Sequence, residues 1–548
     1  MYRMPQEMLQ HWESTRPEHV YLRQRLDRQW HDFDWRRVTD EARRMAAALT
    51  VLGVEPGAPV GIMSKNCAHW FIADFALMVG GFVSVPLYPT ANARTIRYVL
   101  EHSECRACFI GKLDDFEPQR AGIPVELITV AFPYPTMPCT HEWNDLIAAH
   151  EPLAQGHLPA PEDTMTIIYT SGSTGNPKGA VHSYYNFAFT GTRIGEFLGW
   201  HDGDRCLSYL PLAHCVERGF VEGSSLYYNG QIHFAESLAT FAEDLKAVRP
   251  TVFGSVPRLW KQFQLGVFAK LPERKLDRLL RIPIVRSLVA RRVRQGLGLQ
   301  AARWLGTGSA PTAPALLAWY RRLGLPIREC WGMTETFACG TATGPKEPYR
   351  IGTIGQPLPQ AEIKIGADKE ILIRTPSMMD GYYKEPDMTA ATFDEDGFLK
   401  TGDCGEIDED GYVRITGRAK EIFKSAKGKY VAPAPIESLL ARNPLIEMAC
   451  VIGLGMPQPV ALIQLAEGGM ADRELVREQL TETLAMVNAE LESHERLDRL
   501  LVVREAWTPE NGLLTPTLKL KRDVIETRYG ERVTNAHREV EFELEHSL

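Results

Sequence analysis

Over roughly the first two thirds of the chain, segments with a helical spacing of hydrophobic residues alternate with short, nearly continuous hydrophobic runs. Between residues 35 and 53 apolar side chains recur every three or four positions, which predicts a helix closed by a glycine. Nearly continuous apolar runs at 59–63 and 83–89 predict strands, and residues 71–79 predict another helix. This alternation is typical of parallel sheets covered by helices, and it returns between residues 184 and 328. We therefore expect an α/β fold with two doubly wound subdomains.

The pattern changes after Gly352 to short strands and tight turns. Residues 361–374 and 408–416 show this pattern, and an Asp-Gly turn lies within 408–416. They predict a small β-barrel-like unit. Beyond Gly417 the pattern is mixed, and one amphipathic helix places five apolar residues on a single face: Val476, Leu480, Leu484, Val487 and Leu491. We expect an N-terminal domain over 1–417 and a small α+β domain over 418–548.

Composition excludes several protein classes. The 548 residues are 44% hydrophobic with a net charge of −8, so the chain is neither collagenous, disordered nor a disulfide miniprotein, and no nucleic-acid partner is expected. The ten cysteines are scattered, which indicates reduced thiols. The beginning lacks a signal-peptide core, and the most apolar stretch, 75–89, falls short of the about 20 residues that cross a bilayer. We expect a cytoplasmic protein.

Residues 272–294 form a basic amphipathic segment in this acidic chain. Eight cations are interleaved with apolar side chains: Arg274, Lys275, Arg278, Arg281, Arg286, Arg291, Arg292 and Arg294. Such a segment is either a solvated helical face over a core stripe or a surface that lies on anionic lipid. The second interpretation predicts peripheral membrane association.

The most informative run is residues 167–179, IIYTSGSTGNPKG, in which an apolar strand leads into hydroxyls, glycines and a lysine. Glycines let backbone N–H groups approach phosphate, hydroxyls donate further hydrogen bonds, and Lys178 adds a charge. The run thus has the composition of a phosphate cradle, made of Thr170, Ser171, Gly172, Ser173, Thr174, Gly175 and Lys178. The run is not a Walker loop, because Pro177 stands where that motif needs glycine.

YTSGSTGNPKG resembles the signature loop of the adenylate-forming superfamily, which comprises acyl-CoA synthetases, nonribosomal adenylation domains and luciferases. Six further motifs follow in the family's order: YLPLAH (209–214), GTGSAP (306–311), ECWGMTE (329–335), TGD (401–403), GRAKE (417–421) and TPTLK (515–519). The chain is most similar to the long-chain fatty acyl-CoA synthetases of this superfamily.

The resemblance implies two half-reactions, in which a carboxylate joins the α-phosphate of ATP, releasing pyrophosphate, and the thiol of coenzyme A then displaces AMP. The first step brings an anion to a polyanion, so charge neutralisation must dominate catalysis. The resemblance implies that residues 170–178 hold the β- and γ-phosphates, Thr334 the α-phosphate and Glu335 the Mg²⁺ ion. It also implies that the adenine is enclosed by Gly308, Ser309, Ala310 and Trp331 with Glu329 at its amino group, that Gly332 contacts the nucleotide, and that Asp403 and Arg418 bind the ribose.

The resemblance also implies a mobile C-terminal domain, whose Lys519 would bridge the carboxylate and α-phosphate oxygens; only alignment of TPTLK with the family's PTGK pattern favours it over Lys521. This domain would rotate about Lys420 after adenylation and bring Gly428 beside the pantetheine. His214 matches the position that lines the carboxylate pocket. The family's usual histidine after the phosphate loop is replaced by Tyr184, with His182 out of register, and neither receives a role.

The run PTVFGSVPRLW at 250–260 favours a medium- or long-chain fatty acid as substrate. Gly254 and Ser255 are small, as the wall of an alkyl tunnel requires, and Trp260 matches the aromatic gate of long-chain members; otherwise it is a core tryptophan. Two alternatives stay open. One is a fatty acyl-AMP ligase that serves a carrier protein. The other is a silent nucleotide-binding scaffold, disfavoured because Lys519, Glu335 and Asp403 are present.

Overall fold

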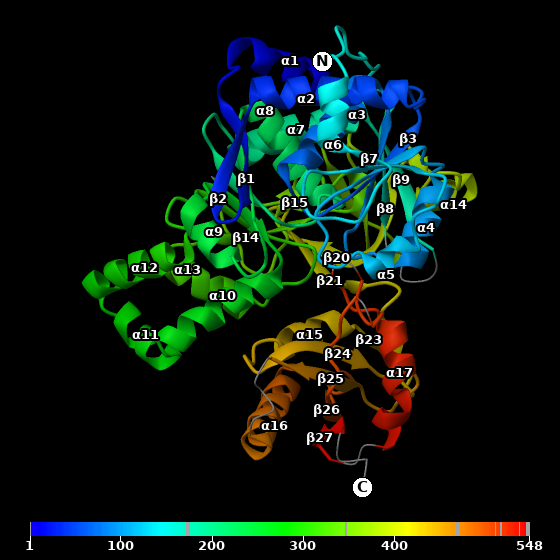
Figure 1. The fold of residues 1–548 in the computed structure, drawn as a ribbon. Coiled ribbons are helices and arrows are strands. Elements are labelled where there is room, and N and C mark those ends of the chain that lie inside the picture. The colour runs from blue at the N-terminus through cyan, green and yellow to red at the C-terminus, as the bar shows by residue number, and fades with distance from the viewer. Residues whose placement is uncertain are drawn as a thin grey trace.

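The computed structural model describes residues 2–170, 176–345, 348–466, 472–509, 511–515, 518–535 and 538–543, and it confirms the α/β fold (Figure 1). The helices of its first part are α1 (Pro5–Thr15), α2 (Trp35–Val51), α3 (Ala68–Gly80), α4 (Ala93–His102), α5 (Glu117–Arg120), α6 (Trp143–Ala149), α7 (Tyr184–Leu198), α8 (Ser224–Tyr228) and α9 (Phe241–Val248). Those that follow are α10 (Pro257–Lys270), α11 (Glu273–Leu280), α12 (Pro283–Leu297), α13 (Pro314–Arg322), α14 (Pro386–Thr392), α15 (Pro433–Leu440), α16 (Arg473–Glu490) and α17 (Arg522–Asn535).

The largest sheet has eight strands in the order β19–β9–β8–β4–β3–β5–β6–β7. They are β3 (Pro59–Met63), β4 (Val83–Leu87), β5 (Ala107–Ile110), β6 (Ile128–Ala131), β7 (His141–Glu142), β8 (Thr164–Thr170), β9 (Lys178–Ser183) and β19 (Gly381–Tyr382). Six of these strands are parallel, as the sequence predicts, but β9 runs antiparallel to both β8 and β19. The phosphate loop is too short for a crossover, so β8 and β9 form a hairpin around it.

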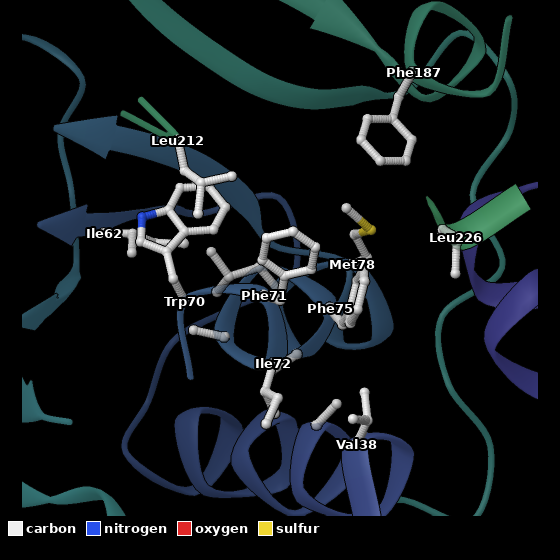
Figure 2. Packing of buried hydrophobic residues seen from close by; sticks show 14 of the residues in the cluster. Val38, Ile62, Trp70, Phe71, Ile72, Phe75, Met78, Phe187, Leu212 and Leu226 are labelled. Carbon is white, nitrogen blue, oxygen red and sulfur yellow. The ribbon is translucent and has the colours of Figure 1, made fainter. Parts of the chain in front are cut away.

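Helices cover both faces of this sheet. α3 is buried along nearly its whole length, and it packs with α2 against one face, whereas Ile96, Val99 and Leu100 of α4 belong to the core cluster on the other face. Figure 2 shows Ile72 of α3 beside Val38 of α2, and Trp70 beside Ile62 of β3. This is the doubly wound arrangement.

Two smaller sheets complete the α/β part. One has the order β12–β13–β14–β15–β16, with β12 (Val252–Ser255), β13 (Trp304–Thr307) and β14 (Ile327–Trp331) parallel and β15 (Thr341–Ala342) and β16 (Gln356–Pro357) antiparallel. The other has the order β10–β11–β1–β2, from β1 (Val20–Leu26), β2 (Gln29–Asp34), β10 (Arg205–Ser208) and β11 (Gln231–Phe234).

The small β unit is a four-stranded antiparallel sheet of β17 (Glu362–Ile365), β18 (Glu370–Arg374), β20 (Leu399–Ile407) and β21 (Val413–Arg418). The C-terminal part then pairs β22 (Phe423–Lys424) with β23 (Tyr430–Val431), and builds a sheet from β24 (Ile446–Ile452), β25 (Val460–Leu465), β26 (Arg499–Val503) and β27 (Val540–Phe542). The expected amphipathic helix is α16, which buries Val476, Leu480, Leu484 and Val487 against this sheet. Figure 1 shows this part set apart from the main body.

The basic segment forms α11 and α12, a helical hairpin that projects from the main body in Figure 1. Leu276, Leu280 and Ala290 are buried in the cluster that also holds Trp260, so one side of the hairpin is packed. Among the described residues, no helix combines the length and apolarity that crossing a bilayer would require.

Candidate active site

The hairpin of β8 and β9 holds the two ends of the phosphate loop. Thr170 and Lys178 are cross-strand partners, and the Thr170 hydroxyl lies 3.5 Å from the Lys178 carbonyl oxygen. The predicted ligands Ser171, Gly172, Ser173, Thr174 and Gly175 lie outside the described residues. Lys178 is half-buried, with its Nζ 5.3 Å from the ring centroid of Tyr382. The hairpin therefore fixes where the loop begins and ends.

The predicted adenine segment follows β13. Ser309 adopts a left-handed backbone, with φ of 67°, and Gly308 approaches β14 so closely that a Cβ there would lie 2.9 Å from the Cys330 carbonyl oxygen. Ser309 and Ala310 are exposed, as a ligand surface requires. Across the parallel pair, Glu329 of β14 stands opposite Thr307, and burial raises the pKa of Glu329 to about 7.

Asp403 of β20 joins the predicted ribose site to the predicted adenine site. Trp331 Nε1 donates a 2.8 Å hydrogen bond to Asp403 Oδ2, and Arg418 Nε lies 3.0 Å from Asp403 Oδ1. Asp403 and Arg418 are also cross-strand partners in β20 and β21. Both carboxylate oxygens are thus oriented, and each keeps a further lone pair for an incoming hydroxyl.

The turn that carries Thr334 and Glu335 is tightly constrained. It forms a short 3₁₀ helix, Thr334–Thr336, followed by Phe337 and Ala338 with φ of 48° and 65°. A Cβ at Gly332 would lie 2.3 Å from the Ala338 carbonyl oxygen, so this position requires glycine. Left-handed non-glycine residues are strained, and such strain concentrates at functional sites.

Lys519 reaches this region from the C-terminal part. Burial lowers the pKa of Lys519 and the charge of Arg418 lowers it further, whereas the carboxylates of Asp403 and Glu335 act in the opposite direction. The structure thus brings Lys519 into electrostatic range of both carboxylates. It also brings Lys519 near His214, whose pKa falls to about 4 through burial and the lysine charge.

His214 is therefore held neutral, and its tautomer is fixed. The backbone N–H of Val216 donates to His214 Nδ1 at 3.2 Å, so the proton of the neutral ring is on Nε2. The next residue, Cys215, places its sulfur 3.8 Å from the Thr334 hydroxyl. The residue that directly follows the YLPLAH motif thus contacts the Thr334 turn.

Glu335 has the donor chemistry that a magnesium ion requires. Its side chain is half-exposed, Oε1 accepts a 2.6 Å hydrogen bond from the Tyr382 hydroxyl, and Oε2 has no partner among the described residues. In the part of the chain that the structure describes, no group of three or more His, Cys, Asp or Glu side chains could form a protein-only metal cage. One carboxylate fits Mg²⁺, because this ion commonly takes one or two carboxylates and completes its shell with phosphates and water.

The residues predicted for the second half-reaction lie in two turns that follow β21 along the chain. Lys420 is exposed in the turn that follows β21, and the neighbouring Ala419 N–H bonds to the Gly402 carbonyl at 2.8 Å. Gly428 has φ of 74° in the turn between β22 and β23. Both are at chain turns, where backbone rotation disturbs little packing.

The predicted acyl residues lie along β12 and the start of α10. No heavy atom lies within 4 Å of where a Cβ on Gly254 would be, so the strand faces open space there. Ser255 Oγ accepts a 2.6 Å hydrogen bond from the Tyr209 hydroxyl. Trp260 is fully buried, and its Nε1 donates to the Gly306 carbonyl at 3.2 Å. In this conformation Trp260 packs as a core residue.

Sequence reasoning missed three residues that hold the site together. His182 Nε2 donates to the Thr334 carbonyl at 2.8 Å, Tyr382 holds Glu335, and Glu217 is buried beneath Tyr209, accepting from Ser208 at 2.7 Å. The partners of His182 and Tyr382 are distant in the chain, and Glu217 accepts from the distant Asn66 as well as from the nearby Ser208. Glu217 lies in the π-helix Glu217–Gly223. The one sequence signal that points to it is its place in the run LPLAHCVERG, which begins within the predicted YLPLAH motif.

A lysine of the C-terminal part that enters such a cluster of predicted nucleotide ligands is typical of the adenylate-forming class of enzymes. The chain belongs to the AMP-binding enzyme family, because residues 9–383 match that family and residues 421–541 match the AMP-binding enzyme C-terminal domain.

Its relatives and structural neighbours agree with this class. The chain is 30% identical over 574 residues to the long-chain-fatty-acid–CoA ligase FadD15 of Mycobacterium bovis, covering 95% of each chain. It is 29% identical to long-chain-fatty-acid–CoA ligase 5 of Rattus norvegicus, over 92% of this chain and 84% of that one. The crystal structure of the anthranilate CoA ligase AuaEII with anthranoyl-AMP shares the fold, with a TM-score of 0.79, 22% identity, and coverage of 97% and 98%.

Proposed function

We propose that the protein activates a medium- or long-chain fatty acid with ATP to an acyl-adenylate, releasing pyrophosphate, and transfers the acyl group to coenzyme A. The observation that carries the proposal is the position of Lys519, which enters the same region as Asp403, Glu335 and His214. The relatives named as long-chain-fatty-acid–CoA ligases support the substrate class.

The first half-reaction follows from the charges of the site. The fatty carboxylate attacks the α-phosphorus, the bond to the β-phosphate breaks, and pyrophosphate leaves. Lys519 neutralises the two anions as they approach, and the phosphate loop with Lys178 holds the leaving group. His214 is neutral, so its Nε2–H donates a hydrogen bond to the carboxylate without adding charge. Thr334 holds the α-phosphate.

The remaining ligands orient the nucleotide. Asp403 and Arg418 hold the ribose hydroxyls and Gly332 contacts the nucleotide, while the adenine is surrounded by Gly308, Ser309, Ala310, Trp331 and Glu329. Mg²⁺, when bound, neutralises phosphate charge during the transfer, and Glu335 would hold it. These assignments follow from the family resemblance together with the contacts described above.

For the second half-reaction we propose that the part of the chain that follows Lys420 rotates about this residue. Lys519 then leaves, and the backbone at Gly428 comes beside the pantetheine of coenzyme A. The thiolate attacks the acyl carbonyl carbon, the bond to the phosphate oxygen breaks, and AMP leaves. The exposed turn at Lys420 supports this hinge.

The acyl chain would lie beside Gly254, where the structure leaves space, with Trp260 as the gate that must move from its bond to Gly306. Each buried methylene contributes about 0.8 kcal/mol, so a tunnel gives affinity and its length sets the preference. The test is mass spectrometry of products after incubation with Mg-ATP, coenzyme A and an equimolar fatty-acid series. Acyl-CoA over a band of lengths supports the proposal; acyl-adenylate without thioester indicates a carrier-protein acceptor, and no product indicates a silent scaffold.

We also propose that the α11–α12 hairpin attaches the enzyme to an anionic membrane, where fatty acids partition. Ile282, Ile284 and Leu288 are 51%, 87% and 53% exposed, and the last two lie one helical turn apart on α12. None of the eight cations forms an ion pair with a carboxylate in the described chain. Cations near an anionic surface contribute about 1 kcal/mol each, so charge complementarity favours lipid.

Vesicle sedimentation tests this attachment. Binding to phosphatidylglycerol vesicles, but not to pure phosphatidylcholine vesicles, should weaken with salt and with Ile284→Glu. The matched control is Val51→Glu, since Val51 is an apolar residue 72% exposed on α2. Absence of binding at low salt, or equal loss in both variants, would remove the hairpin as a membrane contact.

A further inference from the structure

Tyr382 connects two groups of the phosphate site that come from different parts of the sequence. Its hydroxyl donates a 2.6 Å hydrogen bond to Glu335 Oε1, and its ring centroid lies 5.3 Å from Lys178 Nζ. The backbone fixes the same arrangement. β19 pairs Tyr382 with Ala180 of β9, and Met379 N donates to the Glu335 carbonyl oxygen at 2.7 Å. Tyr382 is thus held between the strand that leaves the phosphate loop and the turn that carries Glu335.

We propose that Tyr382 is a positioning residue, which holds one oxygen of the Glu335 carboxylate so that the other faces the nucleotide-bound magnesium ion. This inference rests on the magnesium role proposed above for Glu335. Tyr382 is only 8% exposed, so its phenol cannot move far, whereas a half-exposed glutamate side chain would otherwise sample several rotamers. Oε2 remains without a partner among the described residues, as a metal ligand requires.

The ring and the hydroxyl of Tyr382 have separable roles. The ring lies within cation–π range of Lys178, and the hydroxyl alone reaches Glu335. Tyr382→Phe therefore keeps the lysine contact and removes only the hydrogen bond to the carboxylate. The adjacent Tyr383 supplies a matched control, because its ring packs against His102 with centroids 5.8 Å apart and touches neither Glu335 nor Lys178.

The experiment measures nucleotide binding as well as activity. Calorimetry gives the Kd of ATP with Mg²⁺ and with EDTA, and a magnesium titration gives the half-saturating concentration for adenylation. We expect Tyr382→Phe to weaken Mg-ATP binding and to raise the half-saturating magnesium concentration by about five- to tenfold, since hydrogen bonds to charged groups are among the stronger ones. Metal-free ATP binding and Tm should stay unchanged, and Tyr383→Phe should change nothing.

A double-mutant cycle with Glu335→Ala separates the two proposals. If Glu335→Ala leaves magnesium dependence unchanged, the magnesium role of Glu335 is wrong. If Glu335→Ala changes it and Tyr382→Phe does not, the positioning role is wrong. Full additivity of the two changes would also overturn it, because a residue that acts through Glu335 has no effect once Glu335 is gone. Equal loss of metal-free ATP binding, or a lowered Tm that explains the effect, would make Tyr382 merely structural.

Discussion

An ion pair between Arg258 and Glu447 should bias the enzyme toward the arrangement that forms adenylate. Arg258 is in the first turn of α10, two residues before Trp260, and Glu447 is in β24 of the C-terminal part. Gln464 donates to the second oxygen of Glu447 at 3.1 Å and is itself held by the backbone N–H of Trp507 at 2.9 Å. Glu447 is therefore oriented before it meets Arg258. Rotation of the C-terminal part about Lys420 would break this pair.

The size of the expected effect follows from how exposed the side chains of Arg258 and Glu447 are. The side chains are 41% and 20% exposed, so the pair belongs near the upper end of the about 0.2–1 kcal/mol that surface pairs contribute. A free-energy change of about 1.4 kcal/mol changes an equilibrium constant tenfold. Because Arg258→Gln removes up to about 1 kcal/mol, it should shift the equilibrium between the two arrangements by up to about fivefold. The rate ratio of adenylation to thioester formation depends directly on this balance, so it should fall by the same factor.

The assay compares pyrophosphate exchange with thioester formation from supplied acyl-adenylate. High salt should lower the ratio of the unmodified enzyme toward that of Arg258→Gln, because exposed charges are screened. Exchanging the charges, with Arg258→Glu and Glu447→Arg together, should restore it. Arg322→Gln is the control, since it breaks the pair with Asp277 within the N-terminal part. Equal changes in both half-reactions, or an unchanged ratio, would refute the reasoning.

Three further outcomes are expected. Lys519→Ala should lower adenylation by about 10²-fold or more, through loss of a charge-stabilising group, and largely spare thioester formation from acyl-adenylate; equal loss in both would contradict its role. Lys420→Pro should spare adenylation and impair thioester formation, because proline restricts backbone rotation, and unchanged overall turnover would count against a hinge. Burial raises the pKa of Glu217 from 4.5 to about 8, so its neutral form stabilises the fold at low pH, and this contribution is lost as pH rises through about 8. In urea unfolding between pH 5 and 9, the stability of Glu217→Gln relative to the unmodified protein should therefore increase as the pH rises. Parallel plots of unfolding free energy against pH would exclude this role.

The sequence predicts those elements whose signals lie within a short stretch of the chain. The pattern of residues 35–89 predicts α2, β3, α3 and β4, and the motifs that hold Glu335, Asp403 and Lys519 lie in one region of the structure. It could not predict contacts that depend on how strands pair. The antiparallel course of β9 brings β19 alongside it, and with it Tyr382 against Glu335, although nothing in either local pattern indicates the partner. The sequence also could not distinguish the two interpretations of Trp260. A tryptophan buried in the core and a tryptophan that closes an acyl tunnel fit the same sequence pattern.

The pairing of Arg418 with Asp403 bears on the order in which products leave the enzyme. The two residues are opposite one another in β21 and β20, and the turn with Lys420 comes only afterwards along the chain. If the chain rotates about Lys420 as proposed, Lys519 would leave while the Arg418–Asp403 pair stays in place. With the proposed ribose ligands still in place, the acyl-adenylate would stay bound while the thiol approaches, and AMP would leave only after the thioester has formed.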